Sequence, residues 1–437
     1  MKMKLRELGE PIILFGEKVY ERAERLKQIM ERRIEEYNGF SNELKQIFST
    51  AKNGNNNNNN NPQILPEEEF FTEGTSELLN LRKEILMYSI PRSAYRIALA
   101  KQKYFSNNSI EENKEYDNCL ATHSKLEFIS SQIGDERGCS RGMIAPMDEL
   151  YGVAGWSGIC TIFSTHDLQQ VTQLIGHSER VNSICFNPGY STSIDPKGPN
   201  VLTASNDSTL RLWSLDSNFK RQKSIAFKGH EDKVNYAEFH PLLTVFGSCS
   251  HDKTMRLWDI VKQKEILLQE GHSSGVVSLS FQNDGALVAS GDVGGIGLVW
   301  DLRSGKCIRN LVGHAKQIHK LKFDKNGYQV ISTSEDNSIR VWDLRKDKIL
   351  HIIPGHKDSI CDIQLDKSSS EYESRFALTA SLDSTIKMWD MRDWSVVSTY
   401  TAMSDDKFTS VDITKDGKKM IATSMGKSIK MWTLINK

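Results

Sequence analysis

The sequence predicts an all-β fold, a propeller of seven blades, preceded by a small α-helical N-terminal region. Three observations lead to this prediction. A Gly-His pair recurs along the C-terminal part of the chain, a short apolar segment ending in Trp-Asp or a close variant follows each pair, and the unit repeats about every 40–45 residues. That period suits one propeller blade, which is a sheet of four antiparallel strands.

The repeat can be followed through the whole propeller region. The spacings between successive aromatic positions are 50, 45, 42, 42, 47 and 43 residues, a signature typical of WD40 propellers. Five residues follow the last aromatic, so we expect the chain around 128–135 to supply the outer strand of the last blade and close the ring. The aromatic positions are Phe163, Trp213, Trp258, Trp300, Trp342, Trp389 and Trp432, and the pairs begin at Gly176, Gly229, Gly271, Gly313 and Gly355.

The chain before the propeller has a helical pattern with one interruption. Apolar residues between Val19 and Tyr37 recur at spacings of three and four, which places them on one helix face. A run of seven Asn, Asn55 to Asn61, has no apolar surface to bury, so we expect a disordered insert there. The predicted regions are a helical motif region at 1–50, an Asn-rich linker at 51–69, a helical region at 70–126 and the propeller at 127–437.

The region 70–126 contains signals for three helices. Ser76 is a suitable cap for a helix that continues to Tyr88. Pro91 suits the first turn of a second helix, where its missing N–H costs little. The sequence SIEE, which begins at Ser109, is a capping-box pattern and predicts the start of a third helix.

Four of the repeats carry a His, a Ser, an Asp and a Trp at matching positions. One such set resembles a Ser-His-Asp nucleophilic triad, but a catalytic site is expected once, whereas these residues recur. We therefore interpret them as networks that brace each blade, in which His donates to Asp while Ser and the Trp indole extend the chain of hydrogen bonds. The sets are His177/Ser205/Asp207/Trp213, His230/Ser250/Asp252/Trp258, His314/Ser334/Asp336/Trp342 and His356/Ser381/Asp383/Trp389.

Three blades depart from this pattern at the Asp position. Gly294 occupies it in the blade of His272, Gly426 in the last blade and Ser157 in the first. We expect these three blades to lack the full network, and therefore to be more mobile or to be stabilised by partners.

The remaining composition argues against enzymatic chemistry. Lys+Arg and Asp+Glu both total 56, so the net charge predicts no general attraction to nucleic acid or membranes. The seven Cys are dispersed, as in a reduced intracellular protein, and no apolar run reaches membrane-spanning length. No phosphate-binding loop, HExxH motif or metal-ligand spacing occurs. We expect a non-enzyme without catalytic, metal or cofactor-binding residues and without a small-molecule substrate.

One local stretch, Tyr88 to Asn108, contains basic and aromatic residues but no acid. Basic side chains neutralise phosphates and aromatic rings stack on unpaired bases, so the stretch is a candidate RNA- or partner-binding site. The alternative is an ordinary helix with a solvated basic face and aromatics in its core. The candidate residues are Arg92, Tyr95, Arg96, Lys101 and Lys103.

Short motifs outside the repeats resemble those of a known family. LRELGEPIILFGEKVYERAERLKQI matches a splicing-factor motif, and FFTEG at 70–74, YSIPR at 88–92, SQIGDERG at 131–138, WSGIC at 156–160 and LLQEGH at 267–272 match the same family. The chain thus resembles pre-mRNA-processing factor 4, the WD40-repeat subunit of the U4/U6 small nuclear ribonucleoprotein. The matching motif residues are Leu5, Arg6, Leu8, Gly9, Glu10, Pro11, Leu14, Phe15, Gly16, Glu17, Glu21, Arg22, Arg25 and Leu26.

The resemblance implies a scaffold role in the U4/U6·U5 tri-snRNP, in the nucleus. The implied partners are pre-mRNA-processing factor 3, a spliceosomal cyclophilin, other tri-snRNP proteins and U4/U6 snRNA, contacted directly or indirectly. An alternative function is a propeller that recruits substrates or signalling proteins outside the spliceosome, but no adaptor segment such as an F-box is recognisable in the sequence.

Overall fold

The computed structural model describes residues 74–434 apart from 106–108, 190–200, 216–221, 347, 368–373 and 402–405, together with residues 24, 25 and 27. The chain divides into two compact units, Met1–Glu73 and Gly74–Lys437. In the first unit Glu24, Arg25 and Lys27 are helical; the rest of the predicted motif region and the predicted Asn-rich linker lie outside the described residues. The second unit is described below.

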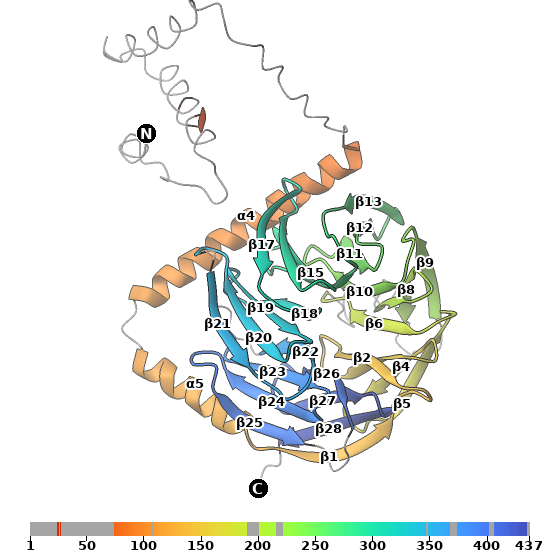
Figure 1. Ribbon diagram of the computed structural model, residues 1–437, viewed down its shortest axis with the longest axis vertical. Coiled ribbons are helices and arrows are strands. Elements are labelled where there is room, and N and C mark those ends of the chain that lie inside the picture. The colour runs from red at the N-terminus through yellow and green to blue at the C-terminus, as the bar shows by residue number, and fades with distance from the viewer. Residues whose placement is uncertain are drawn as a thin grey trace, which may run out of the picture. The chain divides into compact units, whose positions relative to one another are not determined.

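Seven antiparallel four-stranded sheets form the propeller of the second unit, seen down its axis in Figure 1. Blade 1 consists of β2 (Cys139–Ile144), β3 (Leu150–Gly155), β4 (Ile159–Ser164) and β5 (Gln170–Ile175). Blade 2 consists of β6 (Val181–Phe186), β7 (Val201–Ser205), β8 (Thr209–Leu215) and β9 (Gln222–Lys228). Blade 3 consists of β10 (Val234–Phe239), β11 (Val245–Ser250), β12 (Met255–Asp259) and β13 (Lys264–Gln269).

The next three blades follow the same order from the axis to the rim. Blade 4 consists of β14 (Val276–Phe281), β15 (Leu287–Asp292), β16 (Ile296–Asp301) and β17 (Lys306–Val312). Blade 5 consists of β18 (Ile318–Phe323), β19 (Gln329–Ser334), β20 (Ser338–Asp343) and β21 (Lys348–Pro354). Blade 6 consists of β22 (Ile360–Leu365), β23 (Phe376–Ser381), β24 (Thr385–Asp390) and β25 (Val396–Thr401).

Blade 7 joins the two ends of the propeller region. Its strands β26 (Phe408–Ile413), β27 (Lys419–Ser424) and β28 (Ser428–Leu434) are completed by β1 (Leu126–Ile133), which pairs antiparallel with β28. The Phe128 ring packs edge-on against Trp432, with 5.7 Å between ring centroids. The predicted seven-bladed fold is confirmed, and so is ring closure by the segment around 128–135. Pairing β1 with β28 supplies the outer strand of this sheet.

The hydrophobic core lies between neighbouring blades rather than within one. The second strands β11, β15 and β23 are buried along their whole length, whereas the rim strand β21 is largely exposed. One core cluster, for example, joins Leu202 and Leu212 of blade 2 to Phe239, Phe246 and Trp258 of blade 3. Each blade therefore depends on its neighbours for burial of its apolar faces, as repeat architectures require.

Within the described part of the second unit, two helices precede the propeller, α4 (Ser76–Phe105) and α5 (Ser109–His123). The helix predicted to start at Ser109 is present, but the break predicted between Tyr88 and Pro91 is wrong, because α4 continues through Pro91. A proline inside a helix costs about 3 kcal/mol. Contacts with the propeller on both sides of it offset this cost: Tyr88 donates to the carbonyl of Pro241 at 2.8 Å and Arg96 pairs with Asp284.

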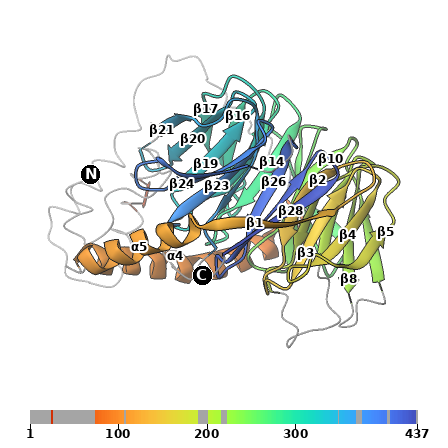
Figure 2. The same ribbon diagram turned by 90° about the horizontal axis from the view of Figure 1, so that it is seen from below.

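Both helices lie across the same face of the propeller (Figure 2). This face, here called the helix face, carries the turns between the first and second strands of each blade. α4 contacts the β10–β11 and β14–β15 turns, and Tyr116 of α5 donates to the carbonyl of Arg375, just before β23. The opposite face carries the Gly-His loops and is called the loop face. No helix in the described part of the chain has the length and apolarity needed to cross a membrane.

Candidate functional site

The predicted blade networks begin with a His–Asp contact on the loop face. The Nδ1–Oδ2 distances are 2.9 Å for His177–Asp207, 2.7 Å for His230–Asp252, 2.9 Å for His314–Asp336 and 3.0 Å for His356–Asp383. All four imidazole side chains are buried. In each of these four blades the structure thus brings the predicted His, which lies in the Gly-His loop, next to the predicted Asp, which lies in the turn between the second and third strands.

The hydroxyl groups of these networks differ from the predicted ones. In blade 3 the Oγ of Ser248, not Ser250, lies 2.7 Å from His230 Nε2 and accepts from the Trp258 indole N–H at 2.8 Å. The equivalent hydroxyls are Thr203, Ser332 and Thr379, each ten residues before its Trp. The predicted Ser250 instead donates to the loop carbonyl of Lys233 at 2.9 Å; Ser205, Ser334 and Ser381 donate to the corresponding loop carbonyls.

Strand geometry explains this correction. Residues 248 and 250 share a face of β11, because side chains alternate along a strand, so the sequence offers both as candidates. Phe246 pairs with Trp258 across the sheet, which makes Ser248 the diagonal neighbour of that Trp and places Ser250 roughly 7 Å further along. A Ser or Thr ten residues before each Trp is the signal that would have identified the bridging hydroxyl.

Blade 4 has a complete network, contrary to the expectation drawn from Gly294. His272 Nδ1 lies 3.1 Å from Asp292 Oδ2, and its Nε2 lies 2.7 Å from Ser290 Oγ, which accepts from the Trp300 indole at 3.0 Å. The carboxyl group simply comes from the end of β15, two residues earlier than in the other blades. The prediction that this blade lacks the full network is therefore wrong.

Blades 1 and 7 use other groups at the same place. In blade 1 Asp135 accepts hydrogen bonds from the hydroxyl and the backbone N–H of Ser157, so the acid comes from the loop instead of the turn. In blade 7 Asp406 pairs with Lys430 at 2.7 Å and accepts from Ser428 at 3.3 Å. The expected difference in mobility between blades stays a prediction.

The electrostatics of the blade 5 network favour a carboxylate beside a neutral imidazole. Burial by itself would raise the pKa of Asp336, but hydrogen bonds from Ser338 and His314 outweigh it and lower the pKa to about 2. Burial also lowers the pKa of His314. The bridging hydroxyl of Ser332 is fully buried and already accepts from Trp342, so no substrate carbonyl can approach it as a triad requires. The described residues contain no group of three or more His, Cys, Asp or Glu side chains that could hold a metal ion.

The candidate basic–aromatic residues all lie on α4 but have different surroundings. Arg96 forms an ion pair with Asp284 at 2.7 Å and donates to the Asn326 carbonyl at 2.7 Å, so it docks the helix on the propeller. Its candidate role in RNA or partner binding stays a prediction, and a phosphate would have to displace both contacts. Arg92, Tyr95 and Lys101 are exposed, while the side chain of Lys103 lies outside the described residues.

The N-terminal motif residues lie outside the described residues, with one exception. Arg25 is helical and half-buried. The motif therefore supports the family resemblance through its sequence alone.

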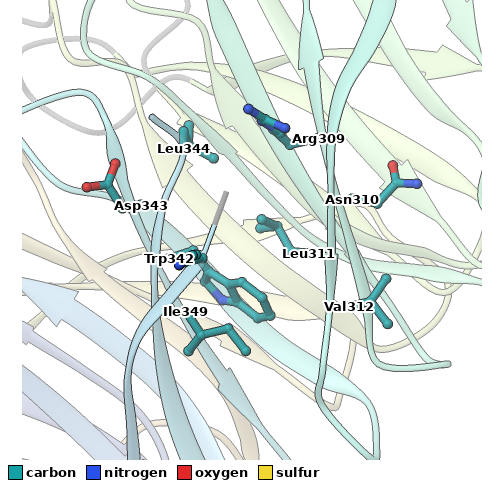
Figure 3. Close-up of a pocket in the computed structure, with 9 residues that line it drawn as sticks. Arg309, Asn310, Leu311, Val312, Trp342, Asp343, Leu344 and Ile349 are labelled. Carbon is teal, nitrogen blue, oxygen red and sulfur yellow. The ribbon is translucent and has the colours of Figure 1, made fainter. Parts of the chain in front are cut away.

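One hollow lies between blades 4 and 5, and another lies between blades 5 and 6. The one in Figure 3 has a volume of about 240 Å³ and is lined by Leu311 of β17, Trp342 of β20 and Ile349 of β21, among others. Its Trp342 belongs to the blade 5 network, so this hollow is a gap at the rim between packed blades. A second, of about 590 Å³, lies on the loop face between the turns at Asp336 and Asp358.

Comparisons with known proteins agree with the sequence motifs. The family model described as pre-mRNA processing factor 4 (PRP4) like matches residues 2–29. A second model, described as Nucleolar protein 10-like, N-terminal domain, matches residues 187–370, which lie within the propeller.

Several similar curated proteins carry the name PRP4. The chain is 28% identical over 207 residues to U4/U6 small nuclear ribonucleoprotein PRP4 of Saccharomyces cerevisiae, covering 47% of this chain and 43% of that protein. It is 34% identical to the Homo sapiens protein U4/U6 small nuclear ribonucleoprotein Prp4, covering 45% of this chain and 35% of that one. It is also 34% identical to a PRP4-like protein of Arabidopsis thaliana, covering 49% and 36%. The matches thus span less than half the length of these relatives.

The motif match lies at the N-terminus and points to the PRP4-like family, whereas the match within the propeller supports the fold alone. The splicing-factor motif precedes a seven-bladed ring, and the relatives carry the name of one subunit. This chain is therefore similar to the pre-mRNA processing factor 4 (PRP4) like family in its N-terminal motif, and to the proteins named PRP4 over less than half of its length.

Proposed function

We propose that this chain is a non-catalytic scaffold subunit of the U4/U6 snRNP and of the U4/U6·U5 tri-snRNP in pre-mRNA splicing. The observation that carries the proposal is the PRP4-like motif at residues 2–29 joined to a seven-bladed propeller. The names of the yeast, human and plant relatives support it. The propeller alone would be weak support, because this fold serves many unrelated functions.

The chemistry of the ring suits a scaffold. His–Asp contacts recur on the loop face in blades 2 to 6 and brace those blades, which gives a rigid platform with two faces and a rim. A rigid platform loses little conformational freedom on binding, so several partners can dock at low entropic cost. We propose pre-mRNA-processing factor 3, a spliceosomal cyclophilin and other tri-snRNP proteins as these partners, in the nucleus, with U4/U6 snRNA contacted directly or through them.

Affinity purification of the full tagged chain from nuclei, followed by RNA sequencing, tests this function. U4 and U6 RNA should be enriched together. A charged substitution in the motif, Leu14→Asp, should reduce that enrichment, whereas Val261→Asp, at a residue that is 80% exposed on the β12–β13 turn, serves as the matched control. Absence of U4 and U6 RNA from the wild-type sample would refute the splicing function.

A further inference from the structure

The outward side of α4 carries a row of exposed apolar side chains, here called the outer stripe. It consists of Leu79, Leu86, Ile90 and Ile97, which are between 42% and 54% exposed. Their successive separations of seven, four and seven residues place them on one side of the helix. Met87 beside them is 74% exposed.

The propeller does not account for this stripe, because α4 already docks through its other side. Leu81 and Ile85, at 5% and 1% exposure, belong to a core cluster with residues of blades 3 and 4. A surface helix that packs on one side ordinarily presents polar residues to water on the other. A contiguous apolar row on the second side marks an interaction surface.

The spacing of the stripe fits a helix as the occupant. Apolar side chains recurring at about 3.5-residue intervals form the seam along which two helices pack. From Leu79 to Ile97 the stripe covers 18 residue steps, which is about 27 Å at 1.5 Å per residue. An amphipathic helix of about five turns would match this length, in the manner of helix-in-groove recognition.

The charges beside the stripe indicate that the occupant is acidic. From Leu79 to Phe105 the one acid is Glu84, whereas Lys83 and Lys101, each four residues after a residue of the stripe, are exposed on the same side of the helix. Acidic flanks on a partner helix would complement these cations and set its position along α4. A second copy of this chain would bring an equally basic α4 against the first, so charge disfavours self-association.

The same residues disfavour RNA as the occupant. Sequence-tolerant RNA binding depends on aromatic platforms for base stacking and on free cations for phosphates. The outer stripe is aliphatic, Tyr88 donates its hydroxyl to the propeller, and Arg96 is held by Asp284. A protein helix fits the apolar side chains better, because it buries them from water.

We propose that the outer stripe of α4 is the docking site for an acidic amphipathic helix of a partner protein. The inference rests on the proposed function in one respect, because the partner is sought in the U4/U6 particle. The surface itself is defined by α4 alone, so the two proposals can fail independently.

Site-specific photo-cross-linking in the full chain tests the occupant. A photoreactive phenylalanine analogue replaces Ile90, with the same replacement at Val261 as the control, and the particle is purified after irradiation. The expected product is an Ile90-specific adduct whose partner peptide is an amphipathic helix with Glu or Asp beside its apolar face. An adduct with RNA, with a second copy, or with residues 1–73 of the same chain would overturn the proposal. Absence of an adduct in a sample that contains U4 and U6 RNA would also overturn it.

Charge reversal checks the predicted complementarity. Lys83→Glu with Lys101→Glu should lower the yield of the adduct by about tenfold. Reversal of the acidic residues of the cross-linked helix to Lys should restore it. An unchanged yield in the reversed chain would contradict the acidic assignment. Sequencing the co-purified RNA in the same samples reports separately on the proposed function.

Paired substitutions separate a docking role from a structural one. Leu86→Ser with Ile90→Ser, in the outer stripe, should abolish the adduct formed from a reporter at Ile97 and leave the melting temperature of the purified chain unchanged. Ile85→Ser, on the buried side, should lower the melting temperature. Equal destabilisation by both changes would show that the stripe serves folding, and the docking proposal would be wrong.

Discussion

The network of blade 4 gives a direct test of how these hydrogen bonds stabilise the propeller. Asp292 Oδ2 lies 3.1 Å from His272 Nδ1, and Oδ1 accepts from the Ile296 backbone N–H at 2.8 Å. The residue is 1% exposed. The substitution Asp292→Asn keeps the shape of the side chain but replaces one accepting oxygen with an amide group that cannot accept. One buried donor, on His272 or Ile296, then has no partner.

The expected loss follows from that single missing bond. A hydrogen bond to a charged group contributes about 1.5–3 kcal/mol, and an unpaired buried donor adds to the penalty, so we expect a loss of about 2–4 kcal/mol. Each 1.4 kcal/mol is a factor of ten, so amide exchange in blade 4 should accelerate by about 30- to 700-fold if it occurs through opening of the blade.

The reciprocal substitution, Gly294→Asp, places an acid where the other blades have one. A Cβ at position 294 would lie 3.4 Å from Asp292 Oδ1 and 3.4 Å from Ser274 Oγ, so the change is sterically acceptable. It should bring no stabilisation, because the Nδ1 proton of His272 already has an acceptor and the new carboxylate lies beside an existing one.

Hydrogen–deuterium exchange of peptides covering 287–301 measures both changes, with Asp252→Asn in blade 3 as a reference for a network of the usual pattern. Faster exchange in Asp292→Asn that is confined to blade 4 and its neighbours is the expected result. If Gly294→Asp protected blade 4 while Asp292→Asn had no effect, the assignment of Asp292 to this network would be refuted.

Three further predictions concern the helix, the ring closure and acid. Arg96→Ala removes the ion pair with Asp284, so exchange should rise in the C-terminal half of α4 while the melting temperature of the propeller changes little; uniform exchange along α4 would contradict this. Phe128→Ala removes an edge-on contact with Trp432, so limited proteolysis should cut β1 first, and initial cleavage elsewhere would argue against this role. The pKa of Asp336 is lowered from 3.8 to about 2, so its stabilising contribution is complete above its unfolded value and is lost as the pH falls toward 2. Asp336→Asn should therefore reduce the dependence of thermal stability on pH between about 4 and 2, and an unchanged acid profile would disprove that contribution.

The fold could be predicted because every blade has the same requirements for burial and for strand pairing. Every blade buries a Trp or Phe on its third strand and pairs four short strands, so the same residue types return at a nearly constant interval. Ring closure could be predicted as well, since the strand left without a partner at Trp432 needed one from elsewhere in the chain.

The details of the networks could not be predicted, because they depend on which residues face one another across strands. Ser248 and Ser250 lie on the same side of β11, and only the pairing of Phe246 with Trp258 decides which of them reaches the indole. Likewise, Asp292 at the end of β15 replaces the acid missing at Gly294, and nothing in the local pattern indicates that substitution.

The sequence by itself determined the repeat period, the seven-bladed ring and the resemblance to the PRP4-like family, since these depend on residue types at fixed intervals and on short motifs. Only the tertiary structure decided how α4 is used. Local rules end a helix before Pro91, but contacts by Tyr88 and Arg96 with separate turns of the propeller hold it continuous. The same docking turns Leu81 and Ile85 inward and leaves Leu86 and Ile90 exposed. The choice of which apolar row meets the core depends on the surface that receives the helix, and that surface is assembled from blades distant in the sequence.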